Sequence, residues 1–411
     1  MAQVFKSIKI GVFIALVNFI IQGISFFVQN FIAKNLGTQD FGYFGILQTD
    51  YSIFCSIADF GMSTLILAYF GVNATRGTLF KNVLQLRVFT AMATAALMAV
   101  FALGFRRGHP VFYGELIMSF GLMFQHAFFD WYFICGKMWK KLFYSKLLHS
   151  ISYSAVMGFS LLYLKLERIE YVALAMVLAA LPAFFFGVTQ ALDFSFFRVT
   201  RRTFRFIFLM LKSGVPYALS SFASFAFIPA GLYVADKFAT GDFLGAYNYG
   251  NKIILLCSGI MVHFISSSLV TQHTFRDKFI HVKDMLIFTG FIAVCSSPLW
   301  ACPSQFLQML FFAVDFDENT LGVGASILRI LSFTLMFQAM RMSLISTLLK
   351  EKATWAYAIR ITAAGAVNLL ACVLAGMNLP DGYIPLFALT GDVALCVLLF
   401  AHFLRKGRIR W

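Results

Sequence analysis

The sequence predicts an all-α polytopic membrane protein in which twelve transmembrane helices form two parallel-repeat six-helix bundles. Three observations predict this fold: a very apolar composition, twelve apolar runs of membrane-spanning length, and a motif that occurs twice. The chain has 411 residues, 60% of them hydrophobic and only 12% charged, with a mean hydropathy of +0.81. A soluble domain of this length needs more charge on its surface. The composition therefore indicates a membrane protein.

A membrane-spanning helix needs about 20 mostly apolar residues. Twelve runs meet this rule, namely residues 8–33, 43–70, 79–104, 113–136, 142–164, 170–192, 206–235, 244–270, 285–303, 321–348, 353–377 and 382–404. Lys6 and Lys9 stand at the start of the first run, and the roughly 25 apolar residues there are too many for a signal-peptide core, so we expect the run to be retained as a span.

A short motif joins the first two runs and recurs between the seventh and the eighth. Ala33, Thr38, Asp40 and Phe41 recur as Ala235, Thr240, Asp242 and Phe243, and each copy continues as Gly-x-aromatic. A spaced internal repeat indicates two structural halves. We therefore expect an N-terminal bundle, residues 1–197, and a C-terminal bundle, residues 198–411. In an apolar chain, two halves are typical of a transporter with a cleft between them.

The distribution of Lys and Arg predicts the orientation of the chain. Alternate loops place 22 of these residues on one side and 6 on the other, and the richer side is cytoplasmic. Both termini are then cytoplasmic and both copies of the motif lie on the outer side. The repeat is therefore parallel, about an axis along the membrane normal.

Several motifs carry a resemblance to a known family. They are Leu-Gly-Thr-Gln-Asp-Phe-Gly-Tyr at 36–43, Ala-Asp-Phe-Gly-Met at 58–62, Lys-Ser-Gly-Val-Pro-Tyr at 212–217, Gly-Ala-Tyr at 245–247 and Ile-Leu-Arg-Ile-Leu at 327–331. Their order and spacing resemble the Wzx-type polysaccharide (O-antigen) flippases of the multidrug/oligosaccharidyl-lipid/polysaccharide exporter superfamily. Two departures matter. Pro229-Ala230-Gly231 stands where many relatives have an acid, and Leu67-Ala68-Tyr69 where many have an arginine.

This resemblance implies a V-shaped pair of bundles that works by alternating access in the bacterial inner membrane. The implied substrate is an anionic oligosaccharide repeat unit on undecaprenyl pyrophosphate, moved from the cytoplasmic to the periplasmic leaflet, with ion coupling. A monomeric transport unit is expected, and the glycan polymerase and chain-length machinery are candidate partners. The resemblance names neither the glycan nor the coupling ion.

Five basic residues within the predicted spans are candidate ligands for the pyrophosphate: Arg87, Lys252, Arg329, Arg341 and Arg360. Charges inside spans are costly against lipid and so mark polar cleft walls. Guanidinium forks match phosphate oxygens in pairs, whereas Lys acts as a point charge. The alternative, strongest for Arg87 and Arg360 near the cytoplasmic edge, is a local acid partner or extension to the interface.

Acids and amides complete the set of candidate cleft residues. Asp50 is expected to pair with Lys252 and help close an outer gate, with separate local hydrogen bonds as the alternative. Asp59 is a candidate for ion coupling or a local cap. His126 and Asp130, four apart on the expected fourth helix, suggest a proton relay or a His satisfied within one bundle.

Helix one and helix seven supply the remaining candidates. Gln22, Gln29 and Asn30 form one polar stripe on helix one, which suits sugar hydroxyls or helix-helix contacts. Pro216 and Pro229, thirteen residues apart in helix seven, favour either a hinge or a static kink.

Other function classes find little support in the sequence. The seven cysteines form no CxxC pair, and we expect no metal site, no cofactor and no nucleic-acid partner despite the net charge of +15. A glycan polymerase or ligase would carry a large outer loop with Arg and His, and residues 303–320 contain neither. We expect a non-enzyme. The alternatives are a cation-coupled multidrug or toxin antiporter of the same superfamily and a lipid II flippase, which usually has fourteen spans.

Overall fold

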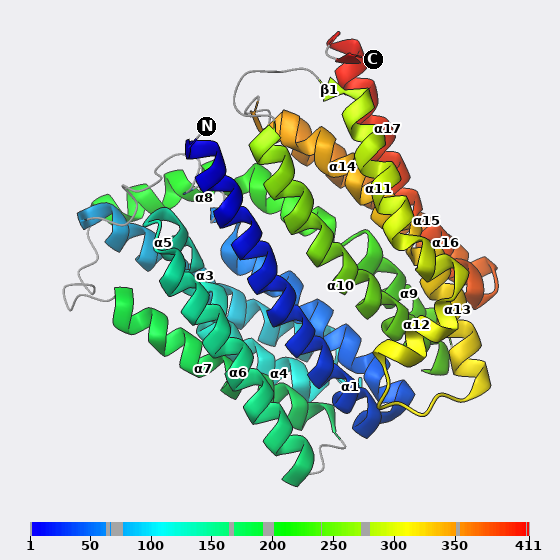
Figure 1. The fold of residues 1–411 in the computed structure, drawn as a ribbon. Helices are drawn as coiled ribbons and strands as arrows, with labels where there is room; N and C mark the ends of the chain where they lie inside the picture. The colour runs from blue at the N-terminus through cyan, green and yellow to red at the C-terminus, as the bar shows by residue number, and fades with distance from the viewer. Residues whose placement is uncertain are drawn as a thin grey trace. The chain divides into compact units, whose positions relative to one another are not determined.

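The described part of the chain is mostly helical and contains one pair of two-residue strands (Figure 1). The computed structural model describes residues 2–62, 66, 77–163, 168–191, 201–239, 241–272, 280–350, 354–407 and 409–410. The prediction of an all-α chain is confirmed over these residues. They cluster into two compact units, one of residues 27–36 and 43–222, the other of residues 1–26, 37–42 and 223–411. We call them the N-terminal unit and the C-terminal unit; the predicted division at 197/198 stays a prediction.

Helix α1, Ala2–Asp59, contains one break that the sequence explains. Gly37 has φ of 76°, a left-handed conformation inside an otherwise helical stretch. Residues that carry a Cβ rarely adopt this backbone conformation, so glycine suits the position. The residues of α1 are shared between the two units.

The N-terminal unit contains α3 (Gly77–Phe105), α4 (Phe112–Gly121), α5 (Asp130–Cys135), α6 (Trp139–Tyr163), α7 (Ile169–Ala191) and most of α8 (Arg201–Ser224). Helix α7 packs against α6 and α4, and α4 packs against α3. The 3-10 turns η2 (Leu122–Phe124) and η3 (His126–Phe129) separate α4 from α5. Buried aromatic side chains such as Trp131 and Phe133 fill the core around these turns.

The C-terminal unit contains α9 (Ile228–Phe238), α10 (Gly241–Gln272), α11 (Val282–Ala301), α12 (Pro303–Leu310), α13 (Glu318–Leu331), α14 (Phe333–Lys350), α15 (Thr354–Asn378), η5 (Asp381–Tyr383), α16 (Ile384–Phe387) and α17 (Thr390–Arg405). Helix α10 packs against α9, α13 and α14, while α15 packs against α9 and α17. Strands β1 (Ile280–His281) and β2 (Ile409–Arg410) pair in parallel.

Six helices of the described chain are long and apolar enough to cross a membrane: Leu79–Phe105, Ile169–Ala191, Arg205–Ser224, Glu318–Arg341, Thr354–Asn378 and Asp381–Arg405. A seventh is formed if Met285–Ala301 and Pro303–Leu310, which bend by 87°, count as one span. A multi-pass helical membrane protein follows from these lengths. The twelve-span, V-shaped arrangement stays a prediction.

Several predicted spans are interrupted in the structure. The run at 113–136 breaks at the two 3-10 turns, and the run at 206–235 breaks between Ser224 and Ile228. In the run at 321–348, α13 ends at Leu331 and α14 begins at Phe333, and in the run at 382–404, η5 and α16 precede α17. Both stretches are still long and apolar enough to count as single spans. A hydropathy window sums the transfer free energies of the side chains. That sum is the same for an apolar run whether its helix is straight or broken, so the window cannot detect a break. These interruptions leave backbone polar groups within apolar runs of the sequence, and such groups need hydrogen-bond partners if the runs lie in a membrane.

Candidate functional site

In the N-terminal unit, one half-buried guanidinium bridges two carboxyl groups. Arg106 Nη2 donates to Asp50 Oδ2 at 2.9 Å, and Arg106 Nε lies 3.2 Å from Glu115 Oε1. Asp50 is on α1, Arg106 follows the last residue of α3, and Glu115 is in the first turn of α4. The turn at Gly108, with φ of +85°, reverses the chain between α3 and α4 and brings Arg106 beside Glu115.

This site was only partly visible in the sequence. The sequence predicts Lys252 as the partner of Asp50, whereas the structure pairs Asp50 with Arg106; the pairing with Lys252 stays a prediction. The signal for Arg106 is its place at the end of one apolar run, with Glu115 at the start of the next. A short turn between antiparallel helices makes such residues neighbours.

A second ion pair lies further along α1. Arg87 Nη1 donates to Asp59 Oδ1 at 2.7 Å, and its guanidinium carbon lies 5.5 Å from the centre of the Phe128 ring. Thr90, one turn along α3, donates to the carbonyl of Ala58 at 2.8 Å. Arg87 is thus held by a local acid, which is the alternative that the sequence left open, and Asp59 is its partner.

The predicted relay of His126 and Asp130 depends on one continuous helix, and the structure interrupts it. Residues 126–129 form the 3-10 turn η3, and α5 begins at Asp130. The side chain of His126 lies outside the described part of the structure. Asp130 Oδ2 lies 3.7 Å from Lys146 Nζ, on α6.

In the C-terminal unit, Arg341 is also paired with an acid. Its Nη1 donates to Asp392 Oδ1 at 2.7 Å, joining α14 to α17, and its guanidinium carbon lies 5.4 Å from the Phe227 ring centre. The side chain of Asp392 is 1% exposed and that of Arg341 is 18% exposed. The acid therefore depends on this arginine for its charge balance.

Neither Arg329 nor Arg360 has an acid within ion-pair distance among the described residues, so no described carboxylate offsets their charge. Arg329 is exposed on α13 and donates through Nε to the carbonyl of Trp300 at 3.1 Å. Arg360, on α15, lies 2.8 Å from Nδ1 of His402 and donates to the carbonyl of Ala356. Both can still attract an anion.

Lys252 lies in a polar stretch of α10. It is half-buried, and Asn248 and Asn251 on the same side of the helix are buried. Two turns further, Ser258 donates to Gln338 Oε1 of α14 at 2.5 Å, and the amide of Gln22 lies against Gly259. We call Asn248, Asn251, Lys252, Ser258 and Gln338, together with Gln22, the amide stripe.

The other amides of the expected helix-one stripe are placed in the N-terminal unit. Asn30 is buried and Gln29 half-buried on α1. Neither Asn30 Oδ1 nor Gln29 Oε1 accepts a hydrogen bond from a described residue. Their use by a sugar stays a prediction.

Asn368 of α15 is a buried residue that sequence reasoning missed. Its Nδ2 donates to the carbonyls of Ala226 at 2.8 Å and Phe227 at 3.1 Å, in the break between α8 and α9. Its Oδ1 accepts from Gly391 N at 2.7 Å and from Thr390 Oγ1 at 3.0 Å, at the start of α17. One side chain thus satisfies the backbone at two helix breaks, as the apolar layer requires.

The two prolines of helix seven flank this break. Pro216 lies inside α8, and Pro229 occupies the first turn of α9, where a proline's missing N–H costs nothing. The prolines therefore mark a broken helix, and a hinge motion there stays a prediction.

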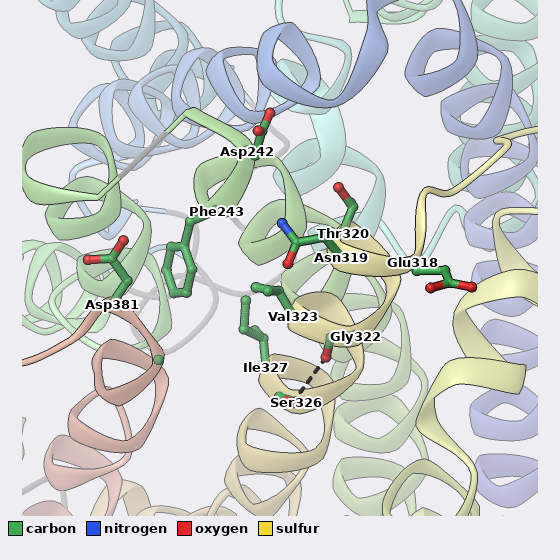
Figure 2. A pocket seen from close by; sticks show the side chains of 11 residues that line it. Asp242, Phe243, Glu318, Asn319, Thr320, Gly322, Val323, Ser326, Ile327 and Asp381 are labelled. Atoms are coloured by element: carbon green, nitrogen blue, oxygen red, sulfur yellow. Dashed lines mark hydrogen bonds between the residues drawn. The ribbon is translucent and has the colours of Figure 1, made fainter.

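A pocket of about 550 Å³ opens at one end of the C-terminal unit (Figure 2). It is lined by α10, α13 and η5, including Asp242, Glu318, Asn319 and Asp381. Ser326 donates to the carbonyl of Gly322 at 3.0 Å in its wall. The described residues contain no group of three or more His, Cys, Asp or Glu side chains that could hold a metal ion.

No protein-family model and no curated protein match the sequence. Solved structures do match the fold. A lipid II flippase, MurJ, in an inward closed conformation superposes with a TM-score of 0.73 at 12% identity, covering 97% of this chain and 88% of that chain. An inward-facing multidrug resistance MATE family transporter of the MOP superfamily gives 0.67 at 13% identity, covering 96% and 98%.

A third neighbour is a MOP superfamily transporter from Pyrococcus furiosus, described as having a binding pocket of reversed polarity. It gives a TM-score of 0.58 at 12% identity and covers 98% of this chain and 96% of that chain. The described helices and these superpositions define the class as a multi-pass helical membrane protein. The particular fold is the one that MurJ and the MATE transporters share.

Proposed function

We propose that this chain is a flippase that moves an undecaprenyl-pyrophosphate-linked oligosaccharide repeat unit from the cytoplasmic to the periplasmic leaflet. The movement uses alternating access between two six-helix bundles of a twelve-span frame and is ion-coupled. Support comes from the motif resemblance, from the Lys and Arg asymmetry, and from a fold shared with a lipid II flippase. The glycan polymerase and chain-length machinery would receive the product.

The amide stripe is the observation that carries the substrate class. A pyrophosphate needs a cation, and sugar hydroxyls need groups that both donate and accept hydrogen bonds. Lys252 offers the first, while Asn251 and Gln338 offer the second. Residues 248–259 contain no acid that would repel an anionic lipid. Lys252 is thus a cation set among neutral amides.

Two further bases of the C-terminal unit agree with an anionic substrate. Arg329 and Arg360 contact a carbonyl and a histidine rather than an acid within the described structure, so their positive charge is not offset by a described carboxylate. A cation-coupled multidrug or toxin antiporter, suggested by the MATE neighbour, would instead need acids to face its cationic substrates. Asp50, Asp59 and Asp392 each bind an arginine, which makes that alternative weaker.

The test is flipping by the purified full-length chain in liposomes that contain an undecaprenyl-pyrophosphate-linked oligosaccharide. The labelled glycan that becomes accessible on the opposite leaflet is measured with a soluble glycan-binding protein. We expect Lys252→Ala to slow flipping by roughly 10- to 100-fold, because a charge-assisted hydrogen bond contributes about 1.5–3 kcal/mol. Lys252→Arg should retain most activity.

The matched control is Lys237→Ala, which removes an exposed lysine near the end of α9 in the same unit. It should flip at the wild-type rate. Transport of a cationic dye by liposomes that leave the lipid-linked glycan in place would overturn the proposal and establish the antiporter. Deletion of the gene should leave the lipid-linked glycan on the cytoplasmic leaflet.

A further inference from the structure

Glu115 is a buried acid whose surroundings do little to stabilise a negative charge on it. Its side chain is 0% exposed, and neither of its oxygens accepts a hydrogen bond from a described residue. Arg106 Nε comes within 3.2 Å but is not aligned to donate to it. A buried carboxylate that accepts no hydrogen bond is costly, and the cost disappears when the group carries a proton.

A protonated Glu115 has a natural acceptor beside it. The carboxyl groups of Asp50 and Glu115 both lie against the Arg106 guanidinium, which brings the two acids close together. Asp50 in turn accepts from Arg106 Nη2 at 2.9 Å, so its negative charge is balanced by the guanidinium. Two neighbouring carboxyl groups favour holding one proton between them, because two carboxylates side by side repel each other.

Among the described residues, Arg106 is the base within ion-pair distance of Glu115. Arg107, next in the α3–α4 turn, is exposed, and the ring of His109 packs edge-on against Tyr43. On α7, Ile169 contacts Gly114 of α4, and the following residue is the acid Glu170.

We propose that Asp50 and Glu115 hold one exchangeable proton between them and that, with Arg106, they form the proton-binding site of this protein. Release breaks the O–H bond and passes the proton to water, leaving two carboxylates against one guanidinium. That charge state favours separation of α1, α4 and the α3–α4 turn. Protonation restores the closed triad, so the site can bias a conformational equilibrium.

The coupling of this proton to transport rests on the proposed function, but the existence of the site does not. Infrared spectroscopy of the full-length protein in lipid nanodiscs therefore comes first, because it needs no cargo. The carboxylic-acid C=O band is recorded across a pH titration. We expect a band from a buried acid at neutral pH that is absent in Glu115→Gln and present in the control Asp315→Asn, which changes an exposed acid.

Two further variants keep the test decisive if Glu115→Gln does not fold. Glu115→Asp should retain the band but change the pH at which it is lost. Asp50→Asn should make Glu115 lose its proton at lower pH, because one like charge is removed and Arg106 remains. An identical neutral-pH band in wild type and Glu115→Gln, or the absence of any buried-acid band in wild type, would overturn the proposal.

Flipping assays then test whether the proton site is coupled to transport. Flipping should accelerate under an imposed pH gradient in wild type and in Asp315→Asn, and lose this dependence in Glu115→Gln. A protein that shows the infrared band but moves no lipid-linked glycan would contradict the proposed function and still support the proton site. Flipping that responds equally to the gradient in wild type and Glu115→Gln would remove this site from the transport cycle.

Discussion

Gly42 of α1 packs directly against the backbone of Gly245 in α10. A Cβ built on Gly42 would lie 2.8 Å from the Gly245 nitrogen, and a Cβ built on Gly245 would overlap the carbonyl of Thr38. Asn248, one turn along α10, donates to the carbonyl of Phe41 at 2.6 Å. The two glycines come from the two copies of the repeated motif, so the repeat supplies a close contact between its own copies.

Gly245→Ala should therefore destabilise the protein. Its added methyl group meets backbone atoms, which cannot rotate away as a side chain can. We expect a loss of about 1–3 kcal/mol, the usual cost of overpacking, seen as a lower midpoint of thermal unfolding in detergent.

The control is Gly290→Ala in α11, where an added Cβ meets nothing within 4 Å. Alanine should be neutral there or stabilise by up to about 1 kcal/mol, through its higher helix propensity. Equal midpoints for both variants would show that the glycine contact does not limit stability.

Asn368→Ala should cost more than any exposed polar substitution on the same helix. It strips partners from the carbonyls of Ala226 and Phe227 and from Gly391 N, all at helix breaks. Each buried group left without a partner costs about 1–3 kcal/mol, so we expect a total of about 3 kcal/mol or more.

Asn378→Ala is the matched control, because Asn378 is exposed on α15 and donates only to the carbonyl of Leu374 among the described contacts. It should change stability by less than about 0.5 kcal/mol. A thermal midpoint for Asn368→Ala that matches this control would mean that water replaces the lost hydrogen bonds.

The sequence and the structure agree best where local composition decides the outcome. Apolar runs predicted helices, and the turn at 106–110 is present between α3 and α4. The breaks that Asn368 stabilises were not predictable, because their partner lies 141 residues away from Phe227 in the sequence. Arg87 and Arg341 were visible as bases, but a hydropathy window cannot tell whether a base faces a substrate or an acid on another helix.

The cap of α13 gives a prediction of pH dependence outside the membrane-spanning segments. Asp317 accepts hydrogen bonds from the side chain and backbone of Thr320, and these hold the pKa of its carboxyl below the ordinary value of 3.8. Because the folded pKa is the lower one, the cap stabilises fully above the unfolded pKa. That stabilisation is lost as pH falls through the folded pKa.

Asp317→Ala should accordingly lower the thermal midpoint at neutral pH and have no effect at a pH below the folded pKa. Asp315→Ala removes an exposed acid that caps no helix in the described structure, and serves as the control. A destabilisation by Asp317→Ala that persists unchanged at low pH would show that the carboxylate charge is not what stabilises α13.

A double-mutant cycle separates a structural role of Arg341 from a role in binding substrate. Arg341→Met leaves Asp392 buried without its cation, and breaking a buried ion pair costs roughly 3–5 kcal/mol. Because Arg341 is 18% exposed, we expect the lower end of that range. Adding Asp392→Leu should recover most of the loss, because the charge and its partner are then both absent.

The flipping rate of the double variant decides what Arg341 does. A refolded double variant that moves the lipid-linked glycan at the wild-type rate assigns Arg341 to the stability of the α14–α17 contact. A stable double variant that has lost flipping assigns its positive charge to the substrate, since the structural penalty has been removed. If the double variant loses as much stability as the two single variants together, the 2.7 Å ion pair carries no coupling energy.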